Sequence, residues 1–168
     1  MNIAMLLKIL HVLSVMALFA GITGRQVTRS QAKKSAKEAG DLKNFLVLSA
    51  LAGQFESKLV IPGSSLVLLF GLALGLLQGW PVLGFLQGAA QNWLLVSNLL
   101  MASMILIIPT IFLPRGKVFE AALKEAIQRG EITPQLTSSL NDPVVRLAHR
   151  WEEFSLVAIT ILMIAKPF

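Results

Sequence analysis

Long apolar runs separated by charged segments dominate the pattern of this chain. A helix needs about 20 residues to cross a membrane at 1.5 Å per residue. The last run is apolar only in its second half, but the pair Asp142-Pro143, an N-cap followed by proline, marks an earlier helix start. The pattern therefore predicts four transmembrane helices, over residues 3–24, 60–78, 92–113 and 143–166.

The charged segments between these runs also have helical patterns. Residues 42–59 place apolar side chains at helical spacing, so they extend the second membrane helix inward or lie on the membrane surface. Residues 117–129 carry two acid–base pairs four residues apart and precede Gly130, which favours a helix that ends there. Thr133-Pro134 predicts the start of a further short helix. We predict a single domain over residues 1–168, an all-α integral membrane bundle of four transmembrane helices with helical cytoplasmic loops.

Composition agrees with a membrane protein. Of 168 residues, 55% are hydrophobic and 14% are charged, whereas soluble domains are about 45–50% apolar and about 25% charged. A soluble chain of this length has no means of burying so much apolar surface, so lipid is its expected surrounding. The absence of cysteine excludes disulfides, thiolate metal sites and covalent haem attachment.

The location of basic residues predicts the topology. Residues 25–58 hold seven Lys or Arg and residues 115–150 hold six, whereas residues 78–92 hold no charge. The positive-inside rule places both basic segments in the cytoplasm, and both termini and residues 78–92 outside a bacterial plasma membrane. A basic segment directly after the first run resists export, so we expect a retained first helix rather than a cleaved signal peptide. These basic residues flank membrane segments without a nucleic-acid-binding fold, so no nucleic-acid partner is expected.

Small residues predict where helices pack closely. A stripe of them follows one face of the first helix, and the second helix carries a GxxxG motif. Small side chains let helices approach closely in lipid, so we expect these two helices to contact each other there. The residues concerned are Ser14, Ala17, Gly21 and Gly24 on the first helix and Gly71 and Gly75 on the second.

His11 lies near the middle of the first span, on the same face as the small residues. An intramembrane histidine binds haem or a metal, relays protons, or forms a structural hydrogen bond as a neutral imidazole. Asn98 has a similar depth and is the expected hydrogen-bond neighbour. For a second axial ligand, His149 lies about 10 Å too close to the cytoplasm, and Met101 matches the depth better. The sequence favours the structural role over the cofactor role.

A second polar cluster is expected at the cytoplasmic surface, around the start of the fourth helix. It serves either as a belt of ion pairs that locks the helix ends or as an entry path for protons or ions. The belt is favoured because no carboxylate continues deeper into the membrane. Within it, we expect Glu153 to pair with Arg25. The belt comprises Arg25, Arg146, His149, Arg150, Glu152 and Glu153.

The stretch 6–14 (LLKILHVLS) and the C-terminal 162–167 (LMIAKP) resemble an uncharacterised bacterial family of predicted integral membrane proteins, domain of unknown function 2269. The resemblance covers the whole chain. The first helix is also similar to that of copper-resistance protein D and of the membrane families of haem-associated protoporphyrinogen oxidases. Lys8 and His11 match their Lys-x-x-His pattern. This second resemblance implies that His11 is a haem or metal ligand.

No catalytic motif is evident in the chain, which argues against an enzyme. The sequence favours a non-enzymatic accessory or structural subunit of a larger membrane complex. Its expected partners are the lipid bilayer and other membrane proteins or further copies of itself. The alternative is a membrane protein that binds b-type haem or a porphyrin through His11.

Overall fold

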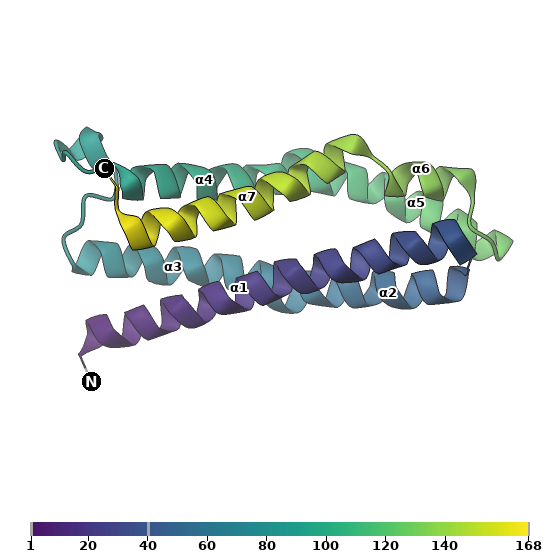
Figure 1. Cartoon of the computed structure of the whole chain (residues 1–168), viewed down its shortest axis with the longest axis horizontal. Helices are drawn as coiled ribbons and strands as arrows, with labels where there is room; N and C mark the ends of the chain where they lie inside the picture. The colour runs from purple at the N-terminus through teal and green to yellow at the C-terminus, as the bar shows by residue number, and fades with distance from the viewer. Residues whose placement is uncertain (1, 40, 168) are drawn as a thin grey trace.

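The computed structural model describes residues 2–39 and 41–167, which form an elongated, all-helical bundle (Figure 1). Its first half is a helical hairpin. One arm is α1 (Ile3–Lys34), which continues into the π-helical segment η1 (Ser35–Ala39). The other arm runs without a break through α2 (Leu42–Phe55), the π-helical segment η2 (Glu56–Val60) and α3 (Ile61–Leu77).

The second half repeats this arrangement with a shorter return arm. After a connection that contains the 3-10 helix η3, one arm runs continuously from α4 through the π-helical segment η4 to α5, and α6 then turns the chain into α7. In Figure 1, α4 and α7 lie side by side, as do α1 and α3. The bounds are η3 Gly84–Gln87, α4 Trp93–Ile107, η4 Ile108–Phe112, α5 Leu113–Arg129, α6 Pro134–Leu140 and α7 Pro143–Ala165.

Local signals set the helix ends as the sequence indicated. Asp142 accepts hydrogen bonds from the backbone N–H groups of Val144 and Val145 at the start of α7. The Thr133 side chain caps α6 in the same way. Gly130 ends α5 with φ of +71°, a conformation that glycine adopts without steric cost. The predicted pairs Glu120–Lys124 and Glu125–Arg129 are formed on α5.

Three of the helices are long and apolar enough to cross a membrane: 3–37, 42–77 and 93–129, with 35, 36 and 37 residues. At 1.5 Å per residue they measure about 50–55 Å, well beyond the roughly 30 Å hydrocarbon layer. The first and third helices therefore continue beyond the predicted spans, because Gly24 does not interrupt α1 where its apolar run ends, and Pro114 and Gly116 do not break the third helix. The charged segments are helical extensions of the spans. The first half of α7 carries too many charges for this helix to be counted with these three, so a fourth span formed by α7 remains a prediction.

Both termini and the connection between α3 and α4 lie at one end of the bundle (Figure 1). The two basic segments gather at the opposite end, beyond the apolar halves of the three long helices. At the termini end, the Lys166 ammonium lies 4.7 Å from the ring centroid of Trp80 and 5.3 Å from that of Trp93. These contacts hold the end of α7 against the connection between α3 and α4 and against the start of α4.

The bundle has two separate apolar cores. The first core joins the apolar parts of α1, α3, α4 and α7. Its buried members include Leu18, Val67, Met101 and Leu156. The second lies in the extensions and is centred on Phe45, which is fully buried against small and aliphatic side chains from α1, α5 and α6. Between these two cores lies the most polar part of the interior.

Candidate functional site

Arg25 is the centre of a buried polar network between the two cores. Its side chain is 2% exposed, although it carries a permanent charge. One terminal nitrogen, Nη1, donates to Glu56 Oε2 at 2.5 Å, and the other, Nη2, donates to Glu152 Oε2 at 2.6 Å. A buried charge is tolerated only when it is paired in this way. Arg25 on α1 therefore ties η2 and α7 to the first helix.

His149 connects Glu152 to Arg29 and so extends the network. Its Nδ1 lies 2.9 Å from Glu152 Oε2, and its Nε2 faces Nη1 of Arg29. Because a guanidinium only donates, Nε2 must accept, and the proton on the ring then lies on Nδ1 and is donated to Glu152. The ring of Phe112 stacks on the imidazole with centroids 4.6 Å apart. His149 is thus a neutral imidazole held on both nitrogens and on one face.

The network contains as many negative as positive side chains. Arg25 and Arg29 are positive, Glu56 and Glu152 are negative, and His149 is neutral. Every carboxylate in it accepts at least one hydrogen bond from a guanidinium or an imidazole. This balance lowers the cost of placing ionised groups between two apolar cores.

Both long continuous arms contribute to the network at their π-helical segments. Glu56 begins η2, which ends two residues before Pro62, and Phe112 ends η4, which contains Pro109. A proline lacks the backbone N–H needed for the regular α-helical ladder, and π-type turns commonly absorb that defect. The two prolines inside apolar runs are a sequence signal for these π-helical segments, but not for the contacts that Glu56 and Phe112 make. Arg29 was missed because it resembles any other residue of the basic segment.

The predicted pairing of Arg25 with Glu153 is wrong. Successive residues of a helix point about 100° apart, so Glu152 and Glu153 cannot face the same neighbour. Buried side chains on α7, including His149 and Leu156, place Glu152 toward the interior and leave Glu153 exposed. Of the six residues expected in the belt, the structure brings together Arg25, His149 and Glu152. It leaves Arg146, Arg150 and Glu153 exposed.

His11 has a different neighbour from the one expected. Its Nδ1 lies 3.1 Å from the backbone carbonyl oxygen of Val67 on α3. Asn98 is engaged elsewhere, since its amide donates to the carbonyl of Val82 at 3.0 Å. Since a carbonyl only accepts, Nδ1 carries the proton and the lone pair of the ring lies on Nε2.

Glycines allow α1 and α3 to approach each other. A Cβ added to Gly71 would lie 2.9 Å from His11 Cε1, and one on Gly21 would lie 2.8 Å from Leu59 Cβ. Gly63, which the sequence analysis did not single out, faces the backbone of Leu18 at 3.1 Å. Gly71 therefore makes room for the imidazole. Two of the expected packing glycines have other neighbours: Gly75 faces Val82 and Leu94, and Gly24 faces the Phe55 ring. Of the other two stripe residues, Ser14 is buried and Ala17 is half-buried.

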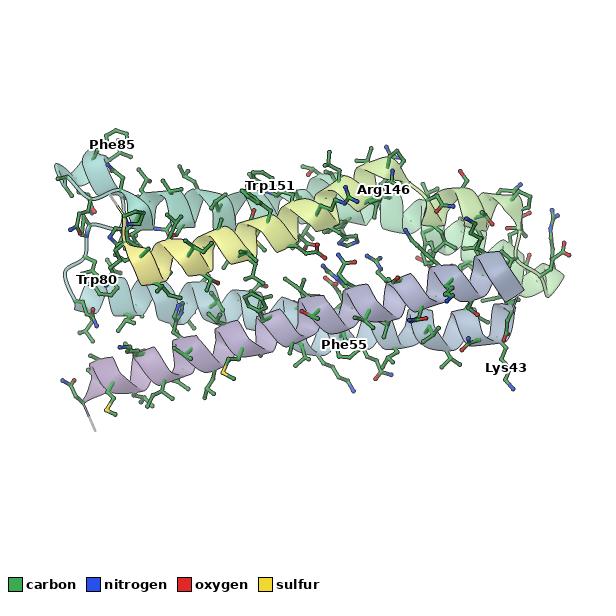
Figure 2. The ribbon with its side chains drawn as sticks, viewed as in Figure 1. Lys43, Phe55, Trp80, Phe85, Arg146 and Trp151 are labelled. Carbon is green, nitrogen blue, oxygen red and sulfur yellow. The ribbon has the colours of Figure 1, made fainter. Side chains whose placement is uncertain are left out.

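A cavity of about 630 Å³ opens beside the network, toward the basic end of the bundle. Arg25, Arg29 and His149 form part of its wall, and Arg146 lines it from α7. Figure 2 shows Arg146 on α7 beyond Trp151, toward α5 and α6. The volume of this cavity lies within the usual range for small-molecule sites.

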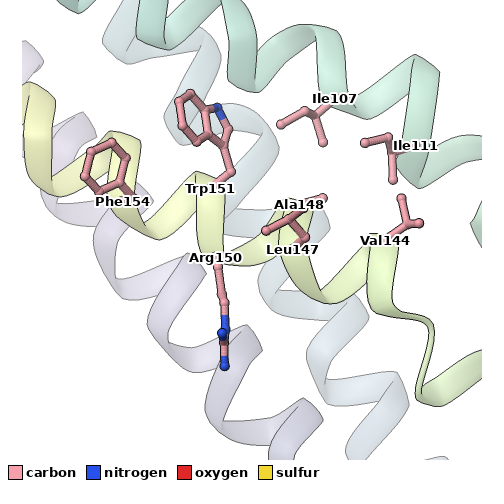
Figure 3. Close-up of a pocket in the computed structure, with 8 residues that line it drawn as sticks. All are labelled: Ile107, Ile111, Val144, Leu147, Ala148, Arg150, Trp151 and Phe154. Atoms are coloured by element: carbon pink, nitrogen blue, oxygen red, sulfur yellow. The ribbon is translucent and has the colours of Figure 1, made fainter.

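A second hollow, of about 590 Å³, lies between the α4–η4 arm and α7. Figure 3 shows its apolar lining, which includes Ile107, Ile111 and Phe154, whereas Arg150 points away from these side chains. The Trp151 indole donates to Ser103 Oγ at 2.9 Å and fixes α7 against α4. An apolar groove on the outside of the bundle is the surface expected to face lipid.

Within residues 2–39 and 41–167, no group of three or more His, Cys, Asp or Glu side chains is arranged to hold a metal ion. No match was found among curated proteins or among solved structures. A family model described as "Predicted integral membrane protein (DUF2269)" matches residues 5–167, nearly the whole chain. The long apolar helices, the paired charges between two cores and this match lead to one conclusion: the chain belongs to the DUF2269 family of integral membrane proteins.

Proposed function

We propose that this protein is a non-enzymatic accessory or structural subunit of a larger assembly in a bacterial plasma membrane, with both termini outside. The observation that carries the proposal is the network around Arg25. Its acids, guanidiniums and imidazole are engaged with one another and join the two helical hairpins. The arrangement therefore supports a role in holding the bundle together.

The termini end of the bundle offers the surface for assembly. Leu83 directly precedes the short helix η3, and Phe85 and Leu86 lie in it; these three side chains are 47%, 62% and 64% exposed. Figure 2 shows Phe85 on this connection, beyond the ends of α3 and α4. Apolar side chains grouped at such a position are typical of protein or membrane interaction sites. We assign this surface to contact with another membrane protein or with a second copy of this chain.

Cross-linking in native membranes tests the assembly. The chain has no cysteine, so Phe85→Cys introduces a unique attachment point for a thiol-directed photo-cross-linker. We expect a discrete cross-linked product of higher mass. Leu106→Cys, on the exposed side of α4, serves as the control that faces lipid and yields little product. A strictly monomeric protein in both variants contradicts the proposal.

Reporter fusions test the topology separately. A reporter enzyme active only outside the membrane should be active at the C-terminus and inactive when inserted after Gly130, the exposed end of α5. The same result establishes α7 as the fourth span, because only a crossing helix separates these two points. A C-terminal reporter active only in the cytoplasm contradicts both statements.

A specific observation favours the alternative function, binding of b-type haem or a porphyrin. Histidines that bind metals usually donate their second ring N–H to a carbonyl or carboxylate. His11 has this arrangement with Val67 and keeps its Nε2 lone pair. His11 would be the axial ligand, and haem would supply redox or gas-binding chemistry. An optical spectrum decides: this alternative requires a Soret band that His11→Ala abolishes and Asn98→Ala retains, and a colourless preparation from haem-replete cells excludes it.

A further inference from the structure

We propose that the cavity beside the network binds a phosphate ester with an apolar portion. The carrying observation is that cationic side chains outnumber carboxylates in the cavity wall, and they remain in excess when Glu152 of the adjoining network is counted. Among the described residues, five cationic side chains line the cavity against two carboxylates; the cations are Arg25, Arg29, Lys33, Arg115 and Arg146, and the carboxylates are Glu56 and Asp142. This inference is independent of the accessory role proposed above.

The two carboxylates are already engaged by other cations. Glu56 accepts from Arg25 at 2.5 Å, and Asp142 accepts from Arg115 at 2.8 Å and also caps α7. Over the part of the chain that the structure describes, no ion pair engages the remaining three lining cations, which are Arg29, Lys33 and Arg146. An anion in the cavity would supply the missing countercharge.

These three cations lie close enough to act on one another. Lys33 follows Arg29 by one turn of α1, and Arg146 lines the same cavity from α7. Like charges grouped in a cleft with apolar walls focus a positive potential and raise the local concentration of anions. Arginine pairs bidentately with phosphate, and a phosphate ester brings one negative charge as a diester or up to two as a monoester to the converging cations. The geometry therefore points to phosphate.

The rest of the wall is apolar. Ile61, Ile108, Phe112 and Phe119 line the same cavity as the cations. A free inorganic phosphate would leave these side chains without a partner, whereas a phosphate ester with a carbon chain contacts both kinds of wall. Two sources supply this chemistry: the headgroup of an anionic phospholipid that enters from the membrane, and a soluble phosphate ester.

Protection of a single cysteine tests occupancy in the full-length protein. Ser139 lines the cavity, whereas Ser138 is exposed and does not line it. In neutral detergent micelles, Ser139→Cys is labelled with a maleimide while phosphatidylglycerol, phosphatidylcholine or hexyl phosphate is titrated. We expect phosphatidylglycerol or hexyl phosphate to slow labelling at least fivefold at saturation, with no effect of phosphatidylcholine and no effect on Ser138→Cys.

Charge variants in the Ser139→Cys background test whether the cations of the cavity cause this protection. Lys33→Gln/Arg146→Gln should weaken protection at least tenfold in ligand concentration. Lys43→Gln/Lys58→Gln removes the same charge from exposed residues outside the cavity and should leave it intact; Figure 2 shows Lys43 at the far end of α2. The charge-retaining Lys33→Arg/Arg146→Lys should also protect, which separates loss of charge from loss of fold.

Each outcome has one meaning. Protection by phosphatidylglycerol alone supports a lipid phosphate, and protection by hexyl phosphate with the same dependence on the two cations supports a soluble ester. Protection by neither probe overturns the proposal. Equal protection of Ser138→Cys and Ser139→Cys, or protection unaffected by removing the two cavity charges, overturns it as well.

Discussion

Nη2 of Arg25 donates to Oε2 of Glu152 at 2.6 Å, although 127 residues separate them. This contact joins the first helix of the chain to the last one, at the level where one apolar core ends and the other begins. Both side chains are almost fully buried, with 2% and 7% of their surface exposed. It is a direct ion pair between the two helical hairpins.

The first prediction compares adjacent carboxylates on α7. Glu152→Gln leaves Arg25 with a weaker partner in a buried site, and removal of one member of a buried ion pair costs about 3–5 kcal/mol. Glu153→Gln alters an exposed side chain and should change stability by no more than about 0.5 kcal/mol. Thermal melts in a mild detergent measure both variants. Equal effects at the two positions would exclude the assignment of Glu152 to the network.

The second prediction is that Arg25 and Glu152 are energetically coupled. Arg25→Gln and Glu152→Gln each leave a buried charge without its partner, so each single variant should be strongly destabilised. The double variant removes both members of this pair, while Glu56 lacks Arg25 in it as in the Arg25→Gln single variant. Its loss of stability should therefore be smaller than the sum of the two single losses by about 0.5–3 kcal/mol. Strict additivity in a double-mutant cycle would rule out a direct ion pair.

The third prediction concerns the approach of α1 to the η2–α3 arm. A Cβ on Gly21 would lie 2.8 Å from Leu59 Cβ and 3.0 Å from the backbone nitrogen of Val60. Because backbone cannot move aside locally, Gly21→Ala should force the helices apart at a cost of about 1–3 kcal/mol. Gly53 on α2 has nothing within 4 Å of such a Cβ, so Gly53→Ala is the control. It should leave stability unchanged or raise it by up to about 1 kcal/mol through helix propensity, and a comparable loss in both variants would contradict the packing described for Gly21.

The fourth prediction concerns a hydroxyl. The Oγ of Ser155 is fully buried without a hydrogen-bond partner among the described residues. A buried unsatisfied polar group costs about 1–3 kcal/mol, so Ser155→Ala should leave stability unchanged or increase it. Ser97 is equally enclosed, but its Oγ donates to the carbonyl of Trp93 at 2.8 Å. Ser97→Ala should therefore lower the melting temperature, and a larger loss in Ser155→Ala would show that its hydroxyl is partnered.

The fifth prediction concerns pH and Asp142. Burial alone would raise the pKa of this carboxyl, but hydrogen bonds from the N–H groups of Val144 and Val145, together with the Arg115 guanidinium, hold the pKa below its usual value. A depressed folded pKa means that the ionised form contributes stability above the unfolded pKa, near 3.9, and that this contribution disappears as pH falls through the folded value. Asp142→Ala should cost about 0.5–2 kcal/mol at pH 7 through loss of the cap. Melts at several pH values should show the cost of Asp142→Asn shrinking below pH 4, and a cost that grows with acid would reverse the assignment.

Short-range features of this protein were readable from the sequence. Three of them depend only on residues within four positions of one another. They are the start of α7 at Asp142-Pro143, the end of α5 at Gly130 and the ion pairs along α5. The excess of apolar residues likewise determined that the helices face lipid, whatever their arrangement. These inferences needed no knowledge of which helix lies beside which.

The partners of the buried polar groups were decided by the tertiary structure. Glu152 and Glu153 are one residue apart in the same charged stretch, and only the packing of α7 against its neighbours determines which one reaches Arg25. His11 likewise found the carbonyl of Val67 because Gly71 lets α3 come close. Such contacts depend on the rotation and spacing of helices far apart in the chain. Those quantities follow from the combined packing of many side chains, and no local stretch of sequence contains them.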